Sequence, residues 1–225
     1  MKKSLPTAFL ILGLLTVLFA KSAFAHALWV EKDTQGHAGV CFGEYGEGLR
    51  EKSGGKLDSI SHLEAWSVGA EEKKTILAAQ KTEDRFSLAS TEKNLLAQDI
   101  QLPVKDMTKY KAGIAKPHLY ARFSGSALSD PDPVLRLDIL PAGAVGAFQV
   151  FFEEKPLADE KAVVIAPNGW TREFKTDKEG KFKAELLWPG LYVVEVTHIV
   201  EKAGNFEGKN YENERHRATL SIEKA

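Results

Sequence analysis

The chain has 225 residues, with 30 basic and 31 acidic side chains and a formal net charge of −1 at neutral pH. This balance, without a basic stripe, argues against a nucleic-acid partner. The single cysteine, Cys41, excludes an internal disulfide, so the hydrophobic core must stabilise the fold unaided. Cys41 lies between Val40 and Phe42 and is predicted to be a small, buried apolar residue.

Residues 1–25 have the pattern of an export signal. Two lysines precede an almost wholly apolar run from Ala8 to Ala20, and Ala23-Phe24-Ala25 fits the small-x-small cleavage pattern. The apolar run is shorter than the roughly 20 residues that a membrane helix needs, and no later stretch is long and apolar enough. We therefore expect a soluble protein that is exported to the periplasm and begins, once processed, with His26.

The stretch from residue 26 to about residue 143 is predicted to consist mainly of short strands. Apolar or alternating runs indicate strands at residues 26–30, 39–42, 61–68, 74–79, 85–89, 118–123 and 134–140. Residues 47–58 are expected to form a polar loop, and residues 92–98 to be helical or irregular. Several short strands separated by turns are typical of a β-sandwich.

A domain boundary is predicted at residues 141–146, where Pro, Gly and Ala replace the strand pattern. Beyond it, strands are expected at residues 147–153, 162–165, 171–176 and 181–187, followed by two longer ones. The prediction is an all-β protein with a signal peptide at 1–25 and two immunoglobulin-like or transthyretin-like β-sandwich domains, at 26–143 and 144–225.

Residues 188–220 contain two alternating runs joined by a polar loop, the pattern of two antiparallel strands. If the loop is symmetric about Glu207, His198 and His216 lie directly opposite one another, with Cβ atoms about 4.5 to 5.5 Å apart. Such a pair can share one metal ion, or it can be two packed, hydrogen-bonded histidines at the end of a core face. Geometry alone favours the packed pair, because a one-residue register slip would separate the rings.

Cleavage after Ala25 would give His26 a free α-amino group beside its imidazole, a chelating pair for copper(II) or nickel(II). The alternative is that His26 has no role in metal binding and is merely the residue that follows the cleavage site. Further oxygen donors for a site are available from Glu44, Tyr45, Tyr211 and Glu212. The sequence has no nucleophile elbow, histidine helix motif or convincing phosphate loop, so we do not expect an enzyme.

Short motifs run through nearly the whole chain after residue 25. They are HALWVE at 26–31, GEY at 43–45, PHLYARF at 117–123, LDILP at 137–141, APNGW at 166–170, WPGLY at 188–192 and RHRATL at 215–220. They resemble a bacterial periplasmic family whose members are labelled nickel uptake or cobalt/nickel transport periplasmic components, or a domain of unknown function. KPL at 155–157, TDKEGKF at 176–182 and PGLY at 189–192 resemble a transthyretin-like or carboxypeptidase-regulatory-like sandwich.

The resemblance implies an accessory protein for metal uptake that binds one divalent transition ion, nickel or cobalt before copper, and works with a membrane metal transporter. The histidines in the characteristic motifs, His26, His198 and His216, joined by His118, are the implied ligands. Because imidazole binds metal in its neutral form, affinity should fall below a pH of about 6.5.

The alternative is a binding or adaptor module without metal, which presents its loops to a membrane transporter, a receptor or a polysaccharide. Four tryptophans could supply an aromatic surface for sugar, although tryptophans of β-sandwiches are more often packing residues. They are Trp29, Trp66, Trp170 and Trp188.

Overall fold

The computed structural model describes residues 26–69, 73–125 and 132–225. The predicted signal peptide at 1–25 lies outside this part of the chain. The regular secondary structure of the described residues is almost all strand, with three short 3-10 helices, so the predicted all-β class is confirmed. No helix among them is long and apolar enough to cross a membrane.

The elements up to residue 125 are β1 (Ala27–Lys32), β2 (Ala38–Glu44), η1 (Tyr45–Glu47), β3 (Leu49–Arg50), η2 (Lys56–Ser59), β4 (Glu64–Val68), β5 (Lys74–Leu77), β6 (Ala79–Lys81), β7 (Phe86–Leu88), β8 (Asn94–Asp99), β9 (Lys105–Asp106), η4 (Thr108–Tyr110) and β10 (Ile114–Ser124). The later ones are β11 (Leu137–Pro141), β12 (Ala147–Phe152), β13 (Lys155–Pro156), β14 (Lys161–Ile165), β15 (Thr171–Lys175), β16 (Lys181–Lys183), β17 (Gly190–Val200), β18 (Gly204–Phe206), β19 (Lys209–Tyr211) and β20 (Asn213–Lys224).

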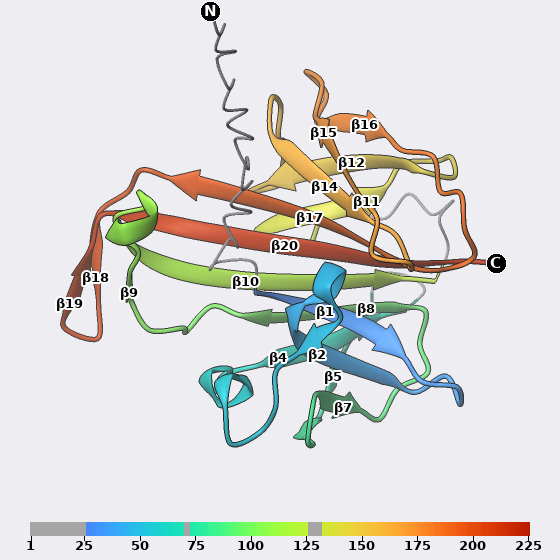
Figure 1. Ribbon diagram of the computed structural model, residues 1–225, viewed down its shortest axis with the longest axis horizontal. Helices are drawn as coiled ribbons and strands as arrows, with labels where there is room; N and C mark the ends of the chain where they lie inside the picture. The colour runs from blue at the N-terminus through green and yellow to red at the C-terminus, as the bar shows by residue number, and fades with distance from the viewer. Residues whose placement is uncertain (1–25, 70–72, 126–131) are drawn as a thin grey trace, which may run out of the picture.

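Apart from the separate β18–β19 hairpin, the described strands form three layers, with a nine-stranded sheet in the middle. This central sheet has the order β15-β14-β17-β20-β10-β8-β4-β5, with β9 also paired to β10. The N-terminal sheet, of β1, β2, β3, β6 and β7, packs on one face, and the C-terminal sheet, of β11, β12, β13 and β16, packs on the other. Figure 1 shows β1 and β2 on one side of β10 and β20, and β11 and β12 on the other.

Each outer sheet closes its own hydrophobic core against the central sheet. Alternation along a strand sends successive side chains to opposite faces. On β10, therefore, Tyr120 packs with Phe148 and Val150 of the C-terminal sheet, whereas Leu119 and Ala121 pack with the N-terminal sheet. Two sandwiches thus share one middle layer.

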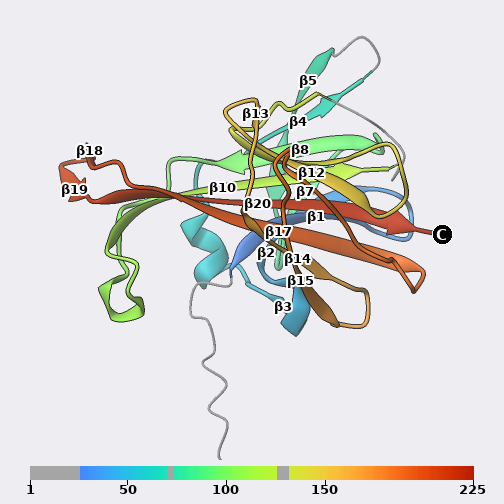
Figure 2. The same cartoon turned by 90° about the horizontal axis from the view of Figure 1, so that it is seen from above.

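The strands β10 and β20 form the centre of the molecule. They run side by side in both views (Figures 1 and 2) and pair in parallel from Ala115 with Asn213 to Ser124 with Ile222. In the described part of the chain, the other strand pairings are antiparallel. Pro117 is tolerated in β10 because its second edge is unpaired there, between Ala115, which pairs with β9, and Leu119, which pairs with β8.

The predicted domain boundary falls in the turn between β11 and β12, which pair with each other. The central sheet takes strands from both sides of that boundary, so the two predicted sandwiches are joined through the β10–β20 pair. Their independence as domains stays a prediction. One local expectation was wrong: residues 94–99 form strand β8, not a helical or irregular segment. Leu95 and Leu96 are buried on opposite faces, so the segment lacks the alternation that marks a half-exposed strand.

Candidate metal centre

Three of the predicted metal-binding histidines lie in one row across the central sheet. The antiparallel register of β17 and β20 places His198 opposite His216, which confirms the register predicted from the symmetric loop. The parallel register of β10 and β20 places His118 beside His216 on the other side. All three share the face that packs against the C-terminal sheet.

His118, His216 and Glu214 bring their ligand atoms together. One nitrogen of each histidine and one carboxylate oxygen of Glu214 all lie within 4.8 Å of one another. The two imidazole rings are stacked, with centroids 4.6 Å apart and planes 9° from parallel. His216 Nε2 lies 3.3 Å from a Glu214 oxygen.

Two nitrogens of this group are buried without a hydrogen bond. These nitrogens are His118 Nε2 and His216 Nε2. The side chain of His216 is 0% exposed. The 3.3 Å contact of His216 Nε2 with Glu214 is an ion-pair distance and is not among the hydrogen bonds of the structure. A buried polar atom without a partner costs free energy, typically about 1 to 3 kcal/mol. An ion that accepted both lone pairs would remove this cost.

Tyr120 and Phe152 fix the ring of His216. The Tyr120 hydroxyl lies 3.0 Å from His216 Nδ1, and the Phe152 ring meets the imidazole edge-on with centroids 5.0 Å apart. Burial raises the pKa of Tyr120, so its hydroxyl keeps its proton. Either Tyr120 donates to Nδ1, and Nε2 carries the imidazole proton, or Nδ1 donates to the Tyr120 oxygen, and Nε2 presents a lone pair. The second tautomer is the one that binds metal.

Burial keeps both imidazoles neutral. It lowers the pKa of His118 to about 3, helped by repulsion from His216 and Lys116. It also lowers the pKa of His216 to about 4, helped by repulsion from Arg136. The expectation that protons compete with a metal below pH 6.5 therefore has to be revised, because these two rings stay unprotonated well below that pH.

Positive side chains surround the carboxylate of Glu214. Arg136 lies 2.9 Å from one of its oxygens and Lys202 lies 3.3 Å from the other. Burial disfavours the charged form of Glu214, but the attraction of Arg136 and Lys202 outweighs it and the pKa of Glu214 is lowered. Glu214 is thus ionised and available as an oxygen ligand, although an incoming cation has to compete with Arg136 and Lys202 for it.

The donor set fits a divalent transition metal, with some rearrangement. Nitrogen and carboxylate ligands lie about 2.0 to 2.2 Å from such an ion, so two of them are at most about 4.4 Å apart. The group must therefore contract from its present 4.8 Å limit. The stacked rings must also tilt toward each other, since their planes are nearly parallel and one ion cannot lie in both planes at once.

His198 is engaged elsewhere. Its Nδ1 lies 2.7 Å from a Glu160 carboxylate oxygen, and its ring packs on Phe152 with centroids 4.7 Å apart. Among the described residues, the convergent ligand group does not include His198. His198 therefore lies opposite His216, as predicted, but its imidazole bonds to the Glu160 carboxylate and does not join the ligand group.

His26 lies on the opposite face of the central sheet from His118 and His216. It borders a pocket with Leu119 and Arg217, which alternate with His118 and His216 along β10 and β20. Its Nδ1 lies 3.2 Å from Glu44, and its Nε2 contacts Glu51. The backbone of the sheet separates His26 from the other predicted ligands, so the four histidines do not form a single site.

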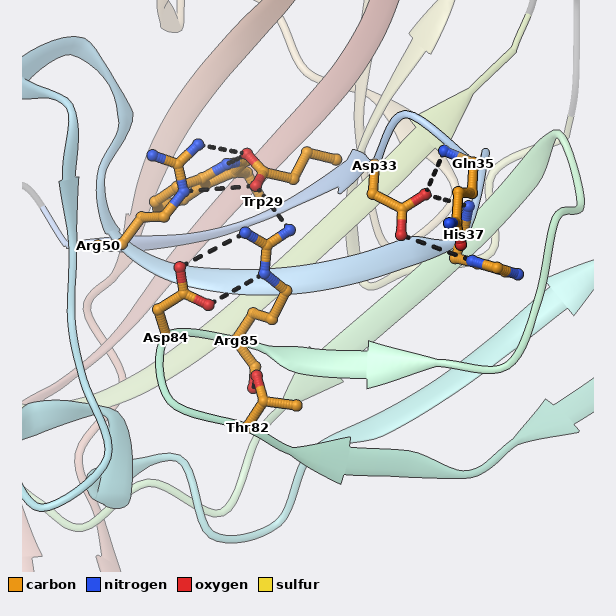
Figure 3. Close-up of polar contacts among 9 residues, drawn as sticks. Trp29, Asp33, Gln35, His37, Arg50, Thr82, Asp84 and Arg85 are labelled. Carbon is orange, nitrogen blue, oxygen red and sulfur yellow. Dashed lines mark hydrogen bonds and ion pairs between the residues drawn. The ribbon is translucent and has the colours of Figure 1, made fainter.

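A second polar cluster lies in the N-terminal sheet (Figure 3). Buried Glu31 accepts a bond of 2.7 Å from Arg50, and Arg85 lies 3.1 Å from its second oxygen. Asp84 binds the other side of Arg85. Each charge here has an opposite partner, which indicates a structural role. Cys41 is buried nearby, as predicted, and burial raises the pKa of its thiol, which disfavours the thiolate form that reacts as a nucleophile.

Sequence reasoning missed Glu214 and Tyr120, the two immediate neighbours of the histidines. The signal was the i, i+2 spacing: Glu214 and His216 share a strand face, as do His118 and Tyr120. Of the oxygen donors suggested instead, Glu44 does contact His26, but Glu212 accepts from the backbone N–H of Ile114. The pairing of β10 with β20 places His118 beside His216. No local sequence pattern predicts this pairing.

Comparisons of the chain with protein families, with curated proteins and with solved structures find no match. The family resemblance of the short motifs therefore stays an expectation. Function has to be argued from the geometry of the site.

Proposed function

We propose that this protein binds one divalent transition-metal ion through His118, His216 and Glu214, and serves as a periplasmic accessory protein in metal uptake. The observation that supports binding is the pair of buried Nε2 atoms without hydrogen bonds, beside an ionised carboxylate. The transport role and the periplasmic location rest on the motif resemblance and on the export-signal pattern of residues 1–25.

The ligand chemistry favours a late first-row transition ion, and the motif resemblance ranks nickel or cobalt before copper. Two imidazole nitrogens and one carboxylate oxygen form a borderline donor set that suits late first-row ions better than magnesium or calcium. Both imidazoles are already neutral, so binding at pH 7 needs no change in their net charge. It does need the tautomer of His216 whose Nδ1 donates to Tyr120, and this bond would then orient the ring as an outer-shell partner does.

Calorimetric titration of metal-free, processed protein with Ni²⁺, Co²⁺ and Cu²⁺ tests the proposal. We expect one ion per chain, and a loss of affinity of at least about 100-fold in His118→Gln and in His216→Gln. His62→Gln is the matched control, since His62 is exposed and lies outside the ligand group. Unchanged affinity in both ligand variants would rule out this site.

Arg136→Gln provides a test in which the expected result is a gain. Arg136 competes for the Glu214 carboxylate at 2.9 Å and repels a cation at the two histidines. Its removal should tighten metal binding by about tenfold, the equivalent of about 1.4 kcal/mol. Misfolding cannot imitate this result. Arg172→Gln, in the exposed strand β15, is the control and should leave the affinity unchanged.

The alternative, a metal-free binding module, is favoured by one surface feature. Trp170 is 65% exposed and Leu187 is 58% exposed, and Trp170 meets Trp188 edge-on with centroids 5.7 Å apart. Exposed apolar clusters of this kind mark interaction sites. Elemental analysis of protein purified from its native compartment separates the two functions, because the metal-free module would contain no stoichiometric nickel, cobalt or copper.

A further inference from the structure

An exposed aromatic platform lies where the turn between β14 and β15 meets the segment before β17. Trp170 is 65% exposed, and its ring meets that of the half-buried Trp188 edge-on, with centroids 5.7 Å and planes 77° apart. Trp29 and Trp66 are only 1% and 3% exposed, so they are packing residues, as is usual for tryptophan. Trp170 is the exception, and its apolar ring is left for another molecule to cover.

Hydrogen bonds fix the backbone of this platform. Trp188 packs against the C-terminal core, and its backbone N–H donates to the hydroxyl of buried Tyr192 over 2.8 Å. In the turn, the backbone N–H of Ala166 donates to the Trp170 carbonyl over 2.8 Å, and the N–H of Trp170 donates to Asn168 Oδ1 over 3.1 Å. Because the platform is ordered before a ligand arrives, binding costs little conformational entropy.

A polar hollow borders the same turn. It has a volume of about 370 Å³, within the range for ligand pockets. It is bordered by residues 166–169 of the turn and by Trp29, Tyr45, Gly46, Gly48 and Arg50. Asn168 connects this hollow to the platform. Because its Oδ1 accepts the bond from the Trp170 N–H, both Nδ2 hydrogens are available as donors to a ligand.

Neither sign of charge prevails around the platform. The charged side chains that border the polar hollow, or the smaller hollow next to the two tryptophans, are Arg50, Arg172 and Glu185. Arg50 is compensated by Glu31, 2.7 Å away, which leaves one cation and one anion. Beside these linings lie one further charge of each sign: Lys224, which donates to the Leu187 carbonyl, and Glu47, which belongs to η1. This balance fits a neutral ligand.

We infer that this surface binds a neutral oligosaccharide of glucose-type rings. Such a ring carries C–H groups on its faces and hydroxyls around its rim, so it needs an aromatic face beside hydrogen-bonding groups. Trp170 supplies the face, and Asn168, two residues away, supplies a donor at the edge of the polar hollow. The two indoles form a corner and not a flat wall, which fits one sugar ring on Trp170 and the next ring turned toward the hollow.

Calorimetric titration of the full processed chain with cellohexaose tests the inference. The surface shares no lining residue with the metal centre, so chelator-treated protein is used and the outcome does not depend on metal binding. Glucose and hexagalacturonate are the comparison probes, because the first lacks neighbouring rings and the second carries charge. We expect cellohexaose to bind at least about tenfold more tightly than either. Absence of cellohexaose binding, or tighter binding of hexagalacturonate, would overturn the inference.

Two variants place the sugar on this surface. Trp170→Ala should weaken cellohexaose binding at least about tenfold with an unchanged thermal midpoint, because the ring is mostly exposed. Asn168→Ser keeps an oxygen for the turn and removes the amide donor, and should weaken binding about fivefold. Ile76→Ala is the control, since Ile76 is 73% exposed on β5, at the other edge of the central sheet from β15. Undiminished binding in Trp170→Ala would refute the assignment.

Tryptophan fluorescence and light scattering separate a sugar from a protein partner. Cellohexaose should protect Trp170 from quenching by acrylamide, and Trp170→Ala should abolish this protection. Light scattering of the sugar-free chain tests whether a second copy covers the platform instead. A dimer that Trp170→Ala converts to monomer would overturn the sugar assignment.

Discussion

Two buried polar groups lie on the same face of β10, one around Arg122 and one around His118. They differ in how many of their polar atoms have hydrogen-bond partners. Arg122 donates to both oxygens of Asp138, over 2.9 and 2.6 Å, and Asp138 also accepts from the backbone N–H groups of Val134, Leu135 and Ile139. His118, by contrast, stacks on His216 with an Nε2 on each ring that lacks a hydrogen bond.

The contrast separates a structural polar group from a candidate ligand group. Both are buried, and burial alone would rank them equally. In the Arg122 group each charge is compensated within the protein, so nothing is gained by a further partner. In the His118 group two buried ring nitrogens have no hydrogen bond, and a bound ion is one way to complete their bonding.

The largest effect is expected from removal of Asp138. Asp138→Ala would leave the Arg122 guanidinium buried without its counter-charge and three backbone N–H groups without their acceptor. We expect the free energy of unfolding to fall by about 3 to 5 kcal/mol. Urea denaturation at pH 7 measures it. A loss below about 1 kcal/mol would contradict the conclusion that the Arg122–Asp138 group stabilises the fold.

The next effect is a loss of stability in acid caused by the histidines. The unfolded His216 takes up a proton near pH 6.5, whereas the folded one does so near pH 4. Its pKa is lower in the folded state, so stability rises with pH across this window and falls on acidification from 6.5 to 4. For His216 alone this amounts to about 3 kcal/mol. Urea denaturation of metal-free protein from pH 7 to 4, beside His216→Gln with a flatter profile, checks it.

A smaller effect, of opposite sign, is expected from His118→Leu in metal-free protein. Leucine fills the position without a buried nitrogen that lacks a bond, so the free energy of unfolding should stay the same or rise by about 1 kcal/mol. The same variant should lose metal binding. Clear destabilisation of the metal-free variant, measured by thermal denaturation, would show that His118 is a packing residue of the fold.

The smallest effect is expected at an exposed ion pair, which serves as the reference for the buried one. Lys161 and Glu173 lie 2.6 Å apart across β14 and β15, and both side chains are more than 60% exposed. Glu173→Ala should lower the free energy of unfolding by no more than about 0.5 kcal/mol. The ratio between this value and the value for Asp138→Ala, measured under the same conditions, shows how much more a buried ion pair contributes to stability than an exposed one.

Local sequence patterns predicted the strands and the opposition of His198 and His216, because alternation and loop symmetry are properties of neighbouring residues. They could not predict that His118 joins His216. That contact depends on the parallel pairing of β10 with β20, whose partners are about 100 residues apart in the chain. They also grouped His26 with the others, because a motif does not show which face of a sheet its residue will occupy.

The position of β20 in the central sheet has a consequence for folding. Residues 213–224 supply an inner strand whose neighbours are β10 and β17, and β10 can pair with it only by closing a loop of some ninety residues. Such long-range pairing slows folding, because the entropy of loop closure is lost before the contacts repay it. Until that strand docks, the inner edges of β10 and β17 lie open to pairing with other chains. A partner that shields these edges during folding would therefore raise the yield of native protein.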